Sequence, residues 1–359
     1  MKIGMIVCWI GKLPDYFKIW EFSCSKNPDY EFLIFTDNPQ NSIYKNIKFI
    51  KFSLDDFNLL ASKKLNMQIN VKKPYKLCDF RPAYGLIFED YLQKYDFWGH
   101  CDIDQIFGKI NDFINFNMLN SYDKINKNGH FVLYKNNKKM NNIFKEKGSL
   151  FNYKEIFYSN ENFAFDEYTG INMIIKENKI KCLFINDFAD IDKAEKRYTC
   201  RNHQNYKYQF YYYLNGKIFK VYIDNGIRKK EMMYLHFQKK TPNINIKTFD
   251  ECIAIGYKSF RNINEKNITK NTIKSINGCE NKFLKFFEKG YYIFKKFKEF
   301  LLSSKEKKRI WIKQKKSMEE YKWKRKKEYW LFMQLITLAL VYKHMHYKHF
   351  WKKIIISLK

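Results

Sequence analysis

Apolar and polar positions alternate in short blocks along the first part of the chain. Mostly apolar runs cover residues 1–10, 30–37 and 47–52. Runs of this length, bounded by turn residues, are typical of buried strands. The segment Leu13–Cys24 between the first two runs has Pro14 near its first turn and predicts a helix. This order of elements predicts an α/β fold with a Rossmann-type sheet flanked by helices.

The middle of the chain continues the alternation less regularly. Segments 55–66 and 78–95 predict helices, the second of which should begin near Pro82. Further strands are expected at 129–134, 171–175, 182–185, 217–223 and 233–237. We expect three parts in all, namely a domain over 1–245, a connecting segment over 246–282 and a basic helical tail over 283–359.

The formal net charge of +30 is concentrated in that tail. Residues 283–359 contain 22 Lys and Arg against 6 acidic residues, which is just over half of the excess. The most apolar stretch, 329–342, is too short to span a hydrocarbon layer of ~30 Å, and lysines and tryptophans surround it. This combination favours a helix in the interface of an anionic membrane. A nucleic-acid surface and a solvated appendage are the competing interpretations, but no nucleic-acid-binding motif is recognisable.

Cysteine usage and the N-terminal segment predict the compartment. The eight cysteines include no CxxC pair, and the first apolar run lacks the basic segment of a secretory signal. Both features predict reduced thiols and a cytoplasmic location. With the basic tail, we expect a peripheral protein on the inner face of the cell membrane.

The most informative stretch is Trp98–Gly108, where Asp102 and Asp104 follow an aromatic run that predicts a buried strand end. In an extended chain, residues i and i+2 point to the same side. Two such carboxylates repel each other unless a cation lies between them, and Mg²⁺ or Mn²⁺ bridging to substrate phosphates is the simplest solution. The alternative is a turn with two solvated acids, which would be preferred for an isolated Asp-x-Asp pair.

Together with the segment Lys73–Gly85, this stretch resembles bacterial glycosyltransferases with the GT-A fold that build surface polysaccharide or lipopolysaccharide, in a variant similar to the family DUF6625. The resemblance covers about residues 1–245 and leaves out the tail. It implies a GT-A-like mixed sheet. It also implies that Asp102 and Asp104 bind a divalent metal across the diphosphate of a nucleotide-sugar, with one of them also near the sugar or ribose.

The same resemblance points to the helix before this strand. Lys76, Asp79 and Arg81 lie there, and related transferases use an Asp and an Arg of this helix to contact the nucleotide-sugar. Lys76 and Asp79 are spaced i and i+3, so they share a helix face. A local ion pair between them, worth little if exposed, is the alternative.

A histidine followed by two lysines ends the last strand predicted for the first domain. Neutral His236 would be a suitable metal ligand, and Lys239 or Lys240 could bind phosphate. The order resembles the His-Phe-x-x-Lys element of retaining GT-A enzymes, in which the histidine completes the metal site and the lysine stabilises the leaving diphosphate. The alternative is a strand-end histidine with solvated lysines.

Three further acids are candidates. Asp166 and Glu167 lie in a predicted loop before Gly170, where they could bind acceptor hydroxyls or act as a general base; an acid pair that caps a turn is the alternative. Asp37, at the end of the second strand, could meet the base or ribose of a nucleotide. A turn cap is the favoured interpretation for Asp37.

These predictions combine into a metal-dependent glycosyltransferase. It would use Mn²⁺ or Mg²⁺ to move a sugar from a nucleotide diphosphate donor, UDP-linked in our prediction, to a saccharide or lipid-linked acceptor. The His236 element favours retention at the anomeric carbon, whereas an inverting enzyme would use Asp166 or Glu167 as base. We expect residues after about 280 to be dispensable for donor hydrolysis.

Two rival functions remain open at the level of sequence. The first is a non-catalytic basic protein that binds anionic membrane or nucleic acid. The second is a nucleotidyltransferase, which also uses paired aspartates. It would need a third carboxylate and a triphosphate site, and the sequence has no Gly-rich phosphate loop.

Overall fold

The computed structural model describes residues 1–195, 197–240, 243–246, 248–249, 251–277 and 282–322. The chain divides into one compact unit, Met1–Ile310, and a second unit that begins at Trp311. The sheets and the cavity described below all belong to the first unit. The apolar stretch 329–342, which we predict to lie in a membrane interface, falls outside the described residues.

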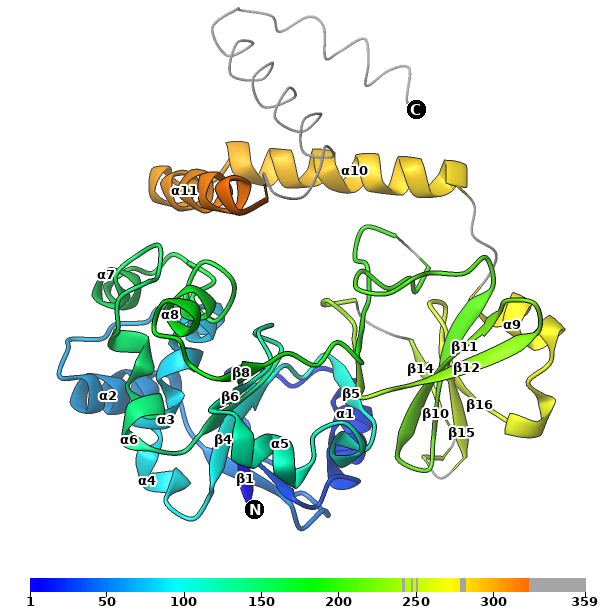
Figure 1. Cartoon of the computed structure of the whole chain (residues 1–359), viewed down its shortest axis with the longest axis horizontal. Coiled ribbons are helices and arrows are strands. Elements are labelled where there is room, and N and C mark those ends of the chain that lie inside the picture. The colour runs from blue at the N-terminus through cyan, green and yellow to red at the C-terminus, as the bar shows by residue number, and fades with distance from the viewer. Residues whose placement is uncertain (196, 241–242, 247, 250, 278–281, 323–359) are drawn as a thin grey trace, which may run out of the picture. The chain divides into compact units, whose positions relative to one another are not determined.

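Seven strands form the main sheet in the order β3-β2-β1-β4-β7-β6-β8 (Figure 1). The first four pair in parallel, β7 is antiparallel to both β4 and β6, and β8 is parallel to β6. The sheet is therefore mixed, as predicted. The strands are β1 (Ile3–Cys8), β2 (Tyr30–Thr36), β3 (Ile47–Lys51), β4 (Phe97–Cys101), β6 (Lys124–Ile125), β7 (Phe131–Lys135) and β8 (Cys182–Leu183).

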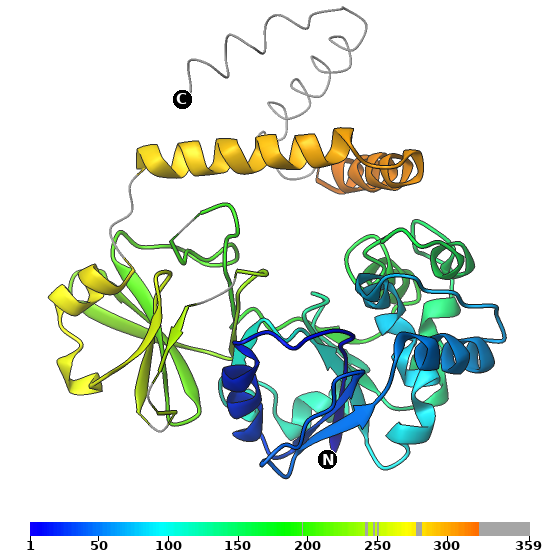
Figure 2. The same cartoon turned by 180° about the vertical axis from the view of Figure 1, so that it is seen from behind.

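Both faces of this sheet are buried, which explains why its strands read as continuous apolar runs. Leu33 and Phe35 of β2 belong to the core on the face covered by α2, whereas Phe32 and Ile34 pack on the other face with Trp20 of α1. The two faces can be followed in Figures 1 and 2. The covering helices include α1 (Phe17–Ser25), α2 (Leu54–Leu65), α3 (Tyr84–Ile87), α5 (Phe116–Ser121), α6 (Lys138–Asn141), α7 (Tyr153–Tyr158) and α8 (Ile171–Glu177).

Two predicted elements are wrong. The helix expected over 78–95 is a 3₁₀ segment, η1 (Pro74–Ala83), followed by the single turns α3 and α4 (Glu89–Leu92). Pro82 lies inside η1, and proline cannot donate the backbone hydrogen bond that a regular helix needs there. The strand expected at 171–175 is helix α8, whose buried residues Ile171, Ile174 and Ile175 have the i, i+3, i+4 spacing of a helix face.

A second sheet is formed by six strands in the order β12-β11-β10-β15-β16-β14. Residues 246–282, expected as a connection, therefore carry two strands of this sheet and a helix that packs on it. The strand predicted at 217–223 is confirmed as β11. The elements are β10 (Gln209–Leu214), β11 (Lys217–Ile223), β12 (Ile227–Met232), β14 (Ile244–Asn245), β15 (Cys252–Ile255), β16 (Phe260–Ile263) and α9 (Lys270–Ile276).

A small third sheet joins distant parts of the sequence and positions the candidate site. Its strands are β5 (Gln105–Phe107), β13 (Tyr234–His236) and β9 (Ala189–Asp190), in the order β5-β13-β9. β13 runs antiparallel to β5, with His236 opposite Gln105, and parallel to β9, with His236 opposite Asp190. This register brings the ends of three distant segments together around His236.

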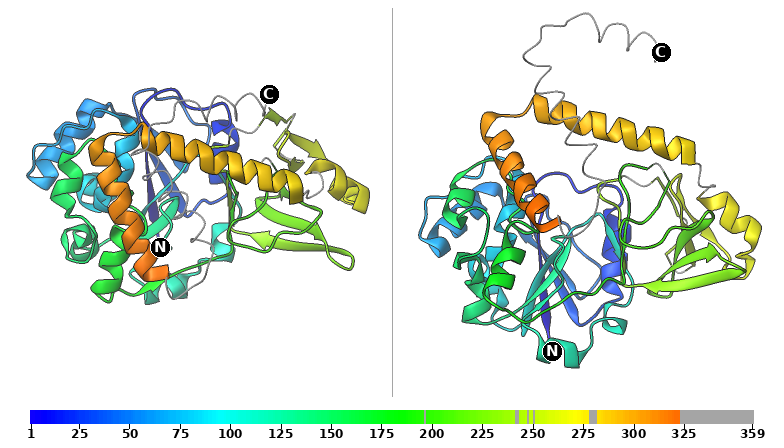
Figure 3. Two further views of the ribbon diagram at one scale, coloured as in Figure 1. Left: turned by 90° about the horizontal axis from the view of Figure 1, so that it is seen from above. Right: turned by 45° about the horizontal axis from the view of Figure 1, so that its top comes forward.

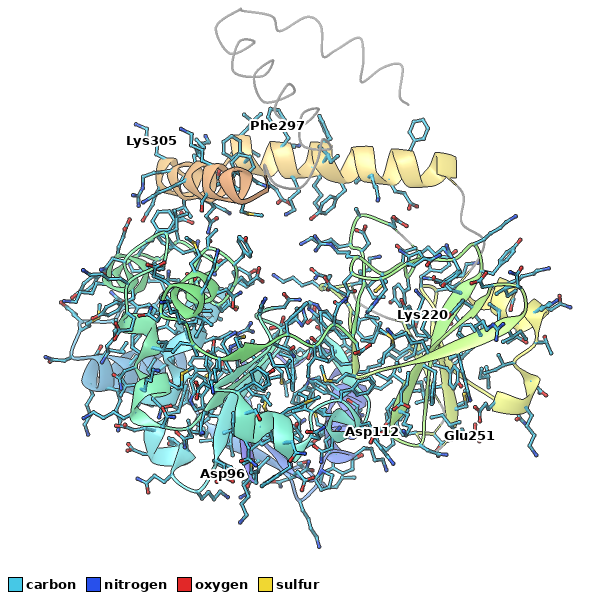
Figure 4. All side chains as sticks on the ribbon, in the orientation of Figure 1. Asp96, Asp112, Lys220, Glu251, Phe297 and Lys305 are labelled. Carbon is cyan, nitrogen blue, oxygen red and sulfur yellow. The ribbon has the colours of Figure 1, made fainter. Side chains whose placement is uncertain are left out.

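Two long helices follow the second sheet. They are α10 (Lys282–Leu301) and α11 (Lys305–Lys322), and α11 crosses from the first unit into the second. Figure 3 shows α10 from two further directions, and Figure 4 labels Phe297 on it and Lys305 at the start of α11. Ile310, only 2 % exposed, belongs to the core around α2 and α8. Among the described helices, none combines the length and apolarity that crossing a bilayer requires.

Candidate functional site

Asp102 and Asp104 lie in a bend between β4 and β5 and not on a strand, which corrects the geometry that the sequence predicts. The bend is held by two hydrogen bonds to the carbonyl of His130, from the backbone N–H of Asp102 at 2.9 Å and from Nε2 of Gln105 at 2.7 Å. Ile103 between the two acids is 3 % exposed and packs in the core. Both carboxylates nevertheless line the same cavity.

His236 brings the two carboxylates into one cluster. Its Nε2 lies 3.5 Å from Oδ2 of Asp102 and 3.4 Å from Oδ1 of Asp104. Its Nδ1 lies 2.9 Å from Oδ1 of Asp190 on the neighbouring strand. Asp190 can therefore accept the Nδ1 proton and leave Nε2 facing the two aspartates, as carboxylates commonly do for metal-binding histidines.

The donor set fits a divalent cation. Ligand atoms of Asp102, Asp104 and His236 all lie within 4.8 Å of one another. Two carboxylates and an imidazole suit Mn²⁺ or Mg²⁺, with further positions available to phosphate oxygens. Burial lowers the pKa of His236, but hydrogen bonds to Asp102, Asp104 and Asp190 outweigh it and raise that pKa well above the ordinary value. A proton on His236 thus partly neutralises the acids when no cation does.

The residues after His236 form a tight turn that is strained at two positions. The N–H of Lys240 donates to the carbonyl of Phe237 at 3.0 Å, and Gln238 and Lys239 have φ angles of 54° and 65°. Side chains other than glycine rarely adopt this left-handed conformation. The turn directs the backbone N–H of Lys239 to Oδ2 of Asp104, so it holds the carboxylate in place.

The two lysines of this turn differ in their surroundings. Both line the cavity, but Lys239 is exposed and its Nζ lies 3.9 Å from the ring centroid of Tyr75. Nζ of Lys240 donates to the carbonyl of Glu195, and burial lowers the pKa of Lys240 to about 8. Lys239 is therefore the better placed of the two to meet an anion in the cavity.

Arg81 connects the metal cluster to the predicted acidic loop. Its guanidinium pairs with Oδ1 of Asp102, and with Oδ2 of Asp166 and the carbonyl of Gly129 at 3.0 Å each. Burial raises the pKa of Asp102, but Arg81 and His236 hold it well below the ordinary value. Asp166 behaves differently, because its burial outweighs Arg81 and raises its pKa to about 8.

Lys76 and Asp79 form a buried ion pair with Nζ and Oδ2 2.7 Å apart. Asp79 also accepts the backbone N–H groups of Phe163 and Phe165 at 2.9 Å, and Lys76 donates to the carbonyl of Glu161 at 2.6 Å. Neither side chain lines the cavity. The pair therefore holds the loop that carries Asp166 and does not face a ligand, which differs from the nucleotide contact that the resemblance implies.

Asp37 is likewise placed away from the cluster. It is exposed, accepts the backbone N–H of Gly11 at 2.8 Å, and does not line the cavity. Its carboxylate therefore ties the end of β2 to the segment that follows β1. Glu167 is also exposed, but it does line the cavity beside Asp166.

The cavity that these residues share has a volume of about 930 Å³. Sequence reasoning missed several residues that line this cavity, and it missed Asp190, which supports His236 without lining the cavity. Asp190 and His130 carried no motif, and Tyr16 comes from the segment before α1. The spacing i, i+3, i+4, i+7 of α10 would place its four contributors on one helix face, but it does not say what that face covers. These are Tyr292, Lys295, Lys296 and Glu299.

Comparison with protein families places the chain in a family whose function is not established. A family model described as "Family of unknown function (DUF6625)" matches residues 5–272, which is well over half of the chain. A search of the curated proteins found no match. The matched segment includes Asp102, Asp104, Asp190 and His236, and it ends before α10.

Proposed function

Since the chain belongs to the family of unknown function DUF6625, we propose its function from the chemistry of the site: a metal-dependent glycosyltransferase of the GT-A type. It would transfer a sugar from a nucleotide diphosphate donor, UDP-linked in this proposal, to a saccharide or lipid-linked acceptor of surface polysaccharide. The convergence of Asp102, Asp104 and His236 in one cavity carries the proposal. The parallel strands β3-β2-β1-β4, which lead to the Asp-x-Asp bend, are consistent with it.

In this proposal Asp102, Asp104 and His236 hold Mn²⁺ or Mg²⁺. When bound, the cation neutralises charge on the diphosphate that leaves the sugar. Lys239 lies exposed at the cavity and adds a positive charge for the same diphosphate. Arg81 has a different task, because it is already shared between two carboxylates: it holds Asp102 ionised and oriented toward His236.

The acidic loop lies on the acceptor side in this proposal. Asp166, which tends to keep its proton at neutral pH, would donate a hydrogen bond to an acceptor or sugar oxygen. Exposed Glu167 is then the better general base of the two, should the reaction invert the anomeric carbon. The strand-end His236 with its lysine turn favours retention, so the stereochemical outcome is a direct experimental question.

The rival function, a basic binding protein without catalysis, has its own support in the charge of +30. The two functions differ in what they require of the cavity. Charge attraction alone needs no pair of aspartates with a histidine that is oriented by a further carboxylate. A screen of nucleotide sugars with Mn²⁺, measured as released nucleotide, separates them: the enzyme releases nucleotide from one donor class, whereas the binding protein releases none.

Peripheral membrane attachment is the second part of the proposal. Residues 323–359 carry nine Lys and Arg against one acidic residue, and each Lys or Arg near an anionic surface contributes ~1 kcal/mol. Co-sedimentation with anionic vesicles should be strong for the full chain and weaker for a chain that ends at residue 322. Equal binding of both chains, or preferential binding of nucleic acid at physiological salt, would speak against the membrane role of the last segment.

A further inference from the structure

A second histidine, His130, lies beside the proposed metal ligands. Its ring centroid is 4.3 Å from that of His236, with an interplanar angle of 30°. Phe188 and Tyr234 pack against it edge-on, at 5.2 and 5.5 Å between centroids. His130 is only 6 % exposed, and it lines the cavity. The ring is therefore held from several sides while it still meets the cavity.

The backbone of His130 is tied to the same site. Its carbonyl oxygen accepts hydrogen bonds from the backbone N–H of Asp102 and from the side chain of Gln105. The bend that carries the two aspartates and the ring of His130 thus share one anchor. These bonds fix the main chain of His130 relative to Asp102, and the neighbouring rings hold its imidazole in place.

The hydrogen bonds around His130 assign its neutral tautomer. Nδ1 lies 3.1 Å from the hydroxyl oxygen of Tyr234. Among the described residues, no other acceptor is recorded for the buried hydroxyl proton of Tyr234. Leaving such a proton without an acceptor costs about 1–3 kcal/mol. In the tautomer that avoids this cost, the hydroxyl of Tyr234 donates to Nδ1 of His130. The ring proton of His130 is then on Nε2.

Nε2 of His130 has no hydrogen-bond partner within the described part of the chain. A buried N–H group without a partner is rare, because it loses its hydration without replacement. A nitrogen of His130 lies within 4.8 Å of ligand atoms of both His236 and Asp190. His130, Asp190 and His236 thus form a second candidate metal cluster, which shares His236 with the cluster of Asp102 and Asp104. An anion bound to a cation at Asp102, Asp104 and His236 is therefore the candidate partner of this N–H group.

We propose that His130 is a diphosphate-binding residue, whose Nε2–H donates a hydrogen bond to a non-bridging oxygen of the donor's diphosphate. This role rests on the proposed function and adds a residue to its donor subsite. It also distinguishes His130 from His236, since a nitrogen that carries a proton donates a hydrogen bond and cannot bind a metal. His130 should therefore affect the affinity for diphosphate and not the affinity for the cation.

The chain offers a matched control. His100 is fully buried, and both of its ring nitrogens are unpartnered among the described residues, but it does not line the cavity. The test uses the full chain with His130→Phe, which keeps a ring against His236, and His100→Phe. His130→Gln, which keeps an N–H donor, decides the question if the phenylalanine variant does not fold.

Two titrations provide the result. Mn²⁺ binding is measured by electron paramagnetic resonance, and UDP binding is measured by calorimetry at saturating Mn²⁺. A hydrogen bond to a charged group is worth about 1.5–3 kcal/mol, so His130→Phe should weaken UDP binding at least ~10-fold. Mn²⁺ affinity should stay within about twofold of the wild type, His130→Gln should recover part of the UDP affinity, and His100→Phe should bind both like the wild type.

Other results would overturn the role of His130. If the wild type binds UDP and His130→Phe binds it as tightly as His100→Phe does, the Nε2–H group of His130 makes no hydrogen bond to the diphosphate. If Mn²⁺ affinity falls as much as UDP affinity, His130 belongs to the metal site. If the wild type itself binds no UDP in the presence of Mn²⁺, the proposed function fails first, and the role of His130 fails with it.

Discussion

His236 is the residue on which the metal site depends, because its Nε2 faces both aspartates while its Nδ1 is bound by Asp190. We predict that His236→Ala lowers Mn²⁺ affinity by more than the ~10–100-fold that the loss of a supporting residue causes. His203→Ala is the control, because His203 belongs neither to the cluster of Asp102, Asp104 and His236 nor to the group of His130, Asp190 and His236. Equal Mn²⁺ titration curves for the wild type and His236→Ala would show that His236 is a strand-end histidine and not a metal ligand.

Asp166 gives a pH dependence of stability in the metal-free protein. Its pKa is about 8 in the folded chain and about 3.9 in an unfolded one, so between these values only the folded state keeps the proton. The free energy of unfolding should therefore fall as pH rises from about 4 to about 8. Asp166→Asn keeps an oxygen for Arg81 and should remove this part of the pH dependence.

The measurement is chemical unfolding of both proteins in EDTA at pH 5 and pH 8. The wild type should lose stability relative to Asp166→Asn over this interval. Asp187→Asn serves as control, because Asp187 is half-exposed and pairs with Lys230 at the surface. An equal change in the wild type and Asp166→Asn would mean that the carboxyl group is ionised in the folded chain throughout.

At the scale of single residues, the sequence predicts the site in part. Asp102, Asp104 and His236 can be named from the sequence because each lies at the end of a predicted strand and has a side chain suited to a metal. Asp190 and His130 could not, since their importance arises only from the pairing of β9 with β13 and from the packing of rings. The i, i+3 spacing of Lys76 and Asp79 predicts that they pair, but the burial of this pair depends on tertiary structure.

Among the elements, the turn after β13 combines strain with a candidate function. Lys239 occupies a left-handed conformation, with φ at 65°, that costs a non-glycine residue about 1 kcal/mol. We predict that Lys239→Gly increases the free energy of unfolding by ~0.5–1 kcal/mol. The backbone N–H to Asp104 remains, but the ammonium group is lost, so UDP-sugar turnover should fall.

Lys179→Gly is the matched control for this prediction. Lys179 also has a left-handed φ, at 52°, but follows α8 and does not line the cavity. It should be stabilised to a similar extent with unchanged turnover, as measured by denaturant unfolding and nucleotide release. If both variants keep full turnover, Lys239 has no part in donor binding.

An element can be predicted from the sequence when the residues next to it in the chain determine its conformation. The strand at 217–223 was predicted correctly because β11 pairs with its sequence neighbours β10 and β12. The prediction of a strand at 171–175 is wrong, because a short apolar run does not distinguish a strand from a buried helix without its tertiary surroundings. The apolar spacing over 78–95 predicts one helix that begins near Pro82, whereas the structure has Pro82 inside a 3₁₀ segment that is followed by single helical turns.

For the whole molecule, the structure changes the role expected of the C-terminal part. The part of this segment up to Ile310 belongs to the first compact unit, because α10 lines the cavity and Ile310 is buried in the main core. Arg309 also pairs with Glu155 at 2.6 Å. We predict that a chain ending at residue 281 unfolds at a lower temperature and loses donor turnover, since burial of Ile310 alone is worth about 1.5–3 kcal/mol.

A chain ending at residue 322 is the control, because it keeps both α10 and α11. It should match the full chain in thermal unfolding and in donor hydrolysis. Full turnover by the chain ending at 281 would restore the original expectation that this segment is dispensable. Loss of turnover by both truncated chains would instead assign a part in the reaction to residues 323–359.

The central claim is that the cluster of Asp102, Asp104 and His236 acts on a nucleotide-sugar through a divalent cation. The most direct measurement is the release of UDP from a UDP-sugar by the full chain and by Asp102→Asn and Asp104→Asn. We predict slow release by the wild type with Mn²⁺, none with EDTA, recovery when Mn²⁺ is restored, and none by either variant although both remain folded. Undiminished release in EDTA, or by either variant, would contradict the account.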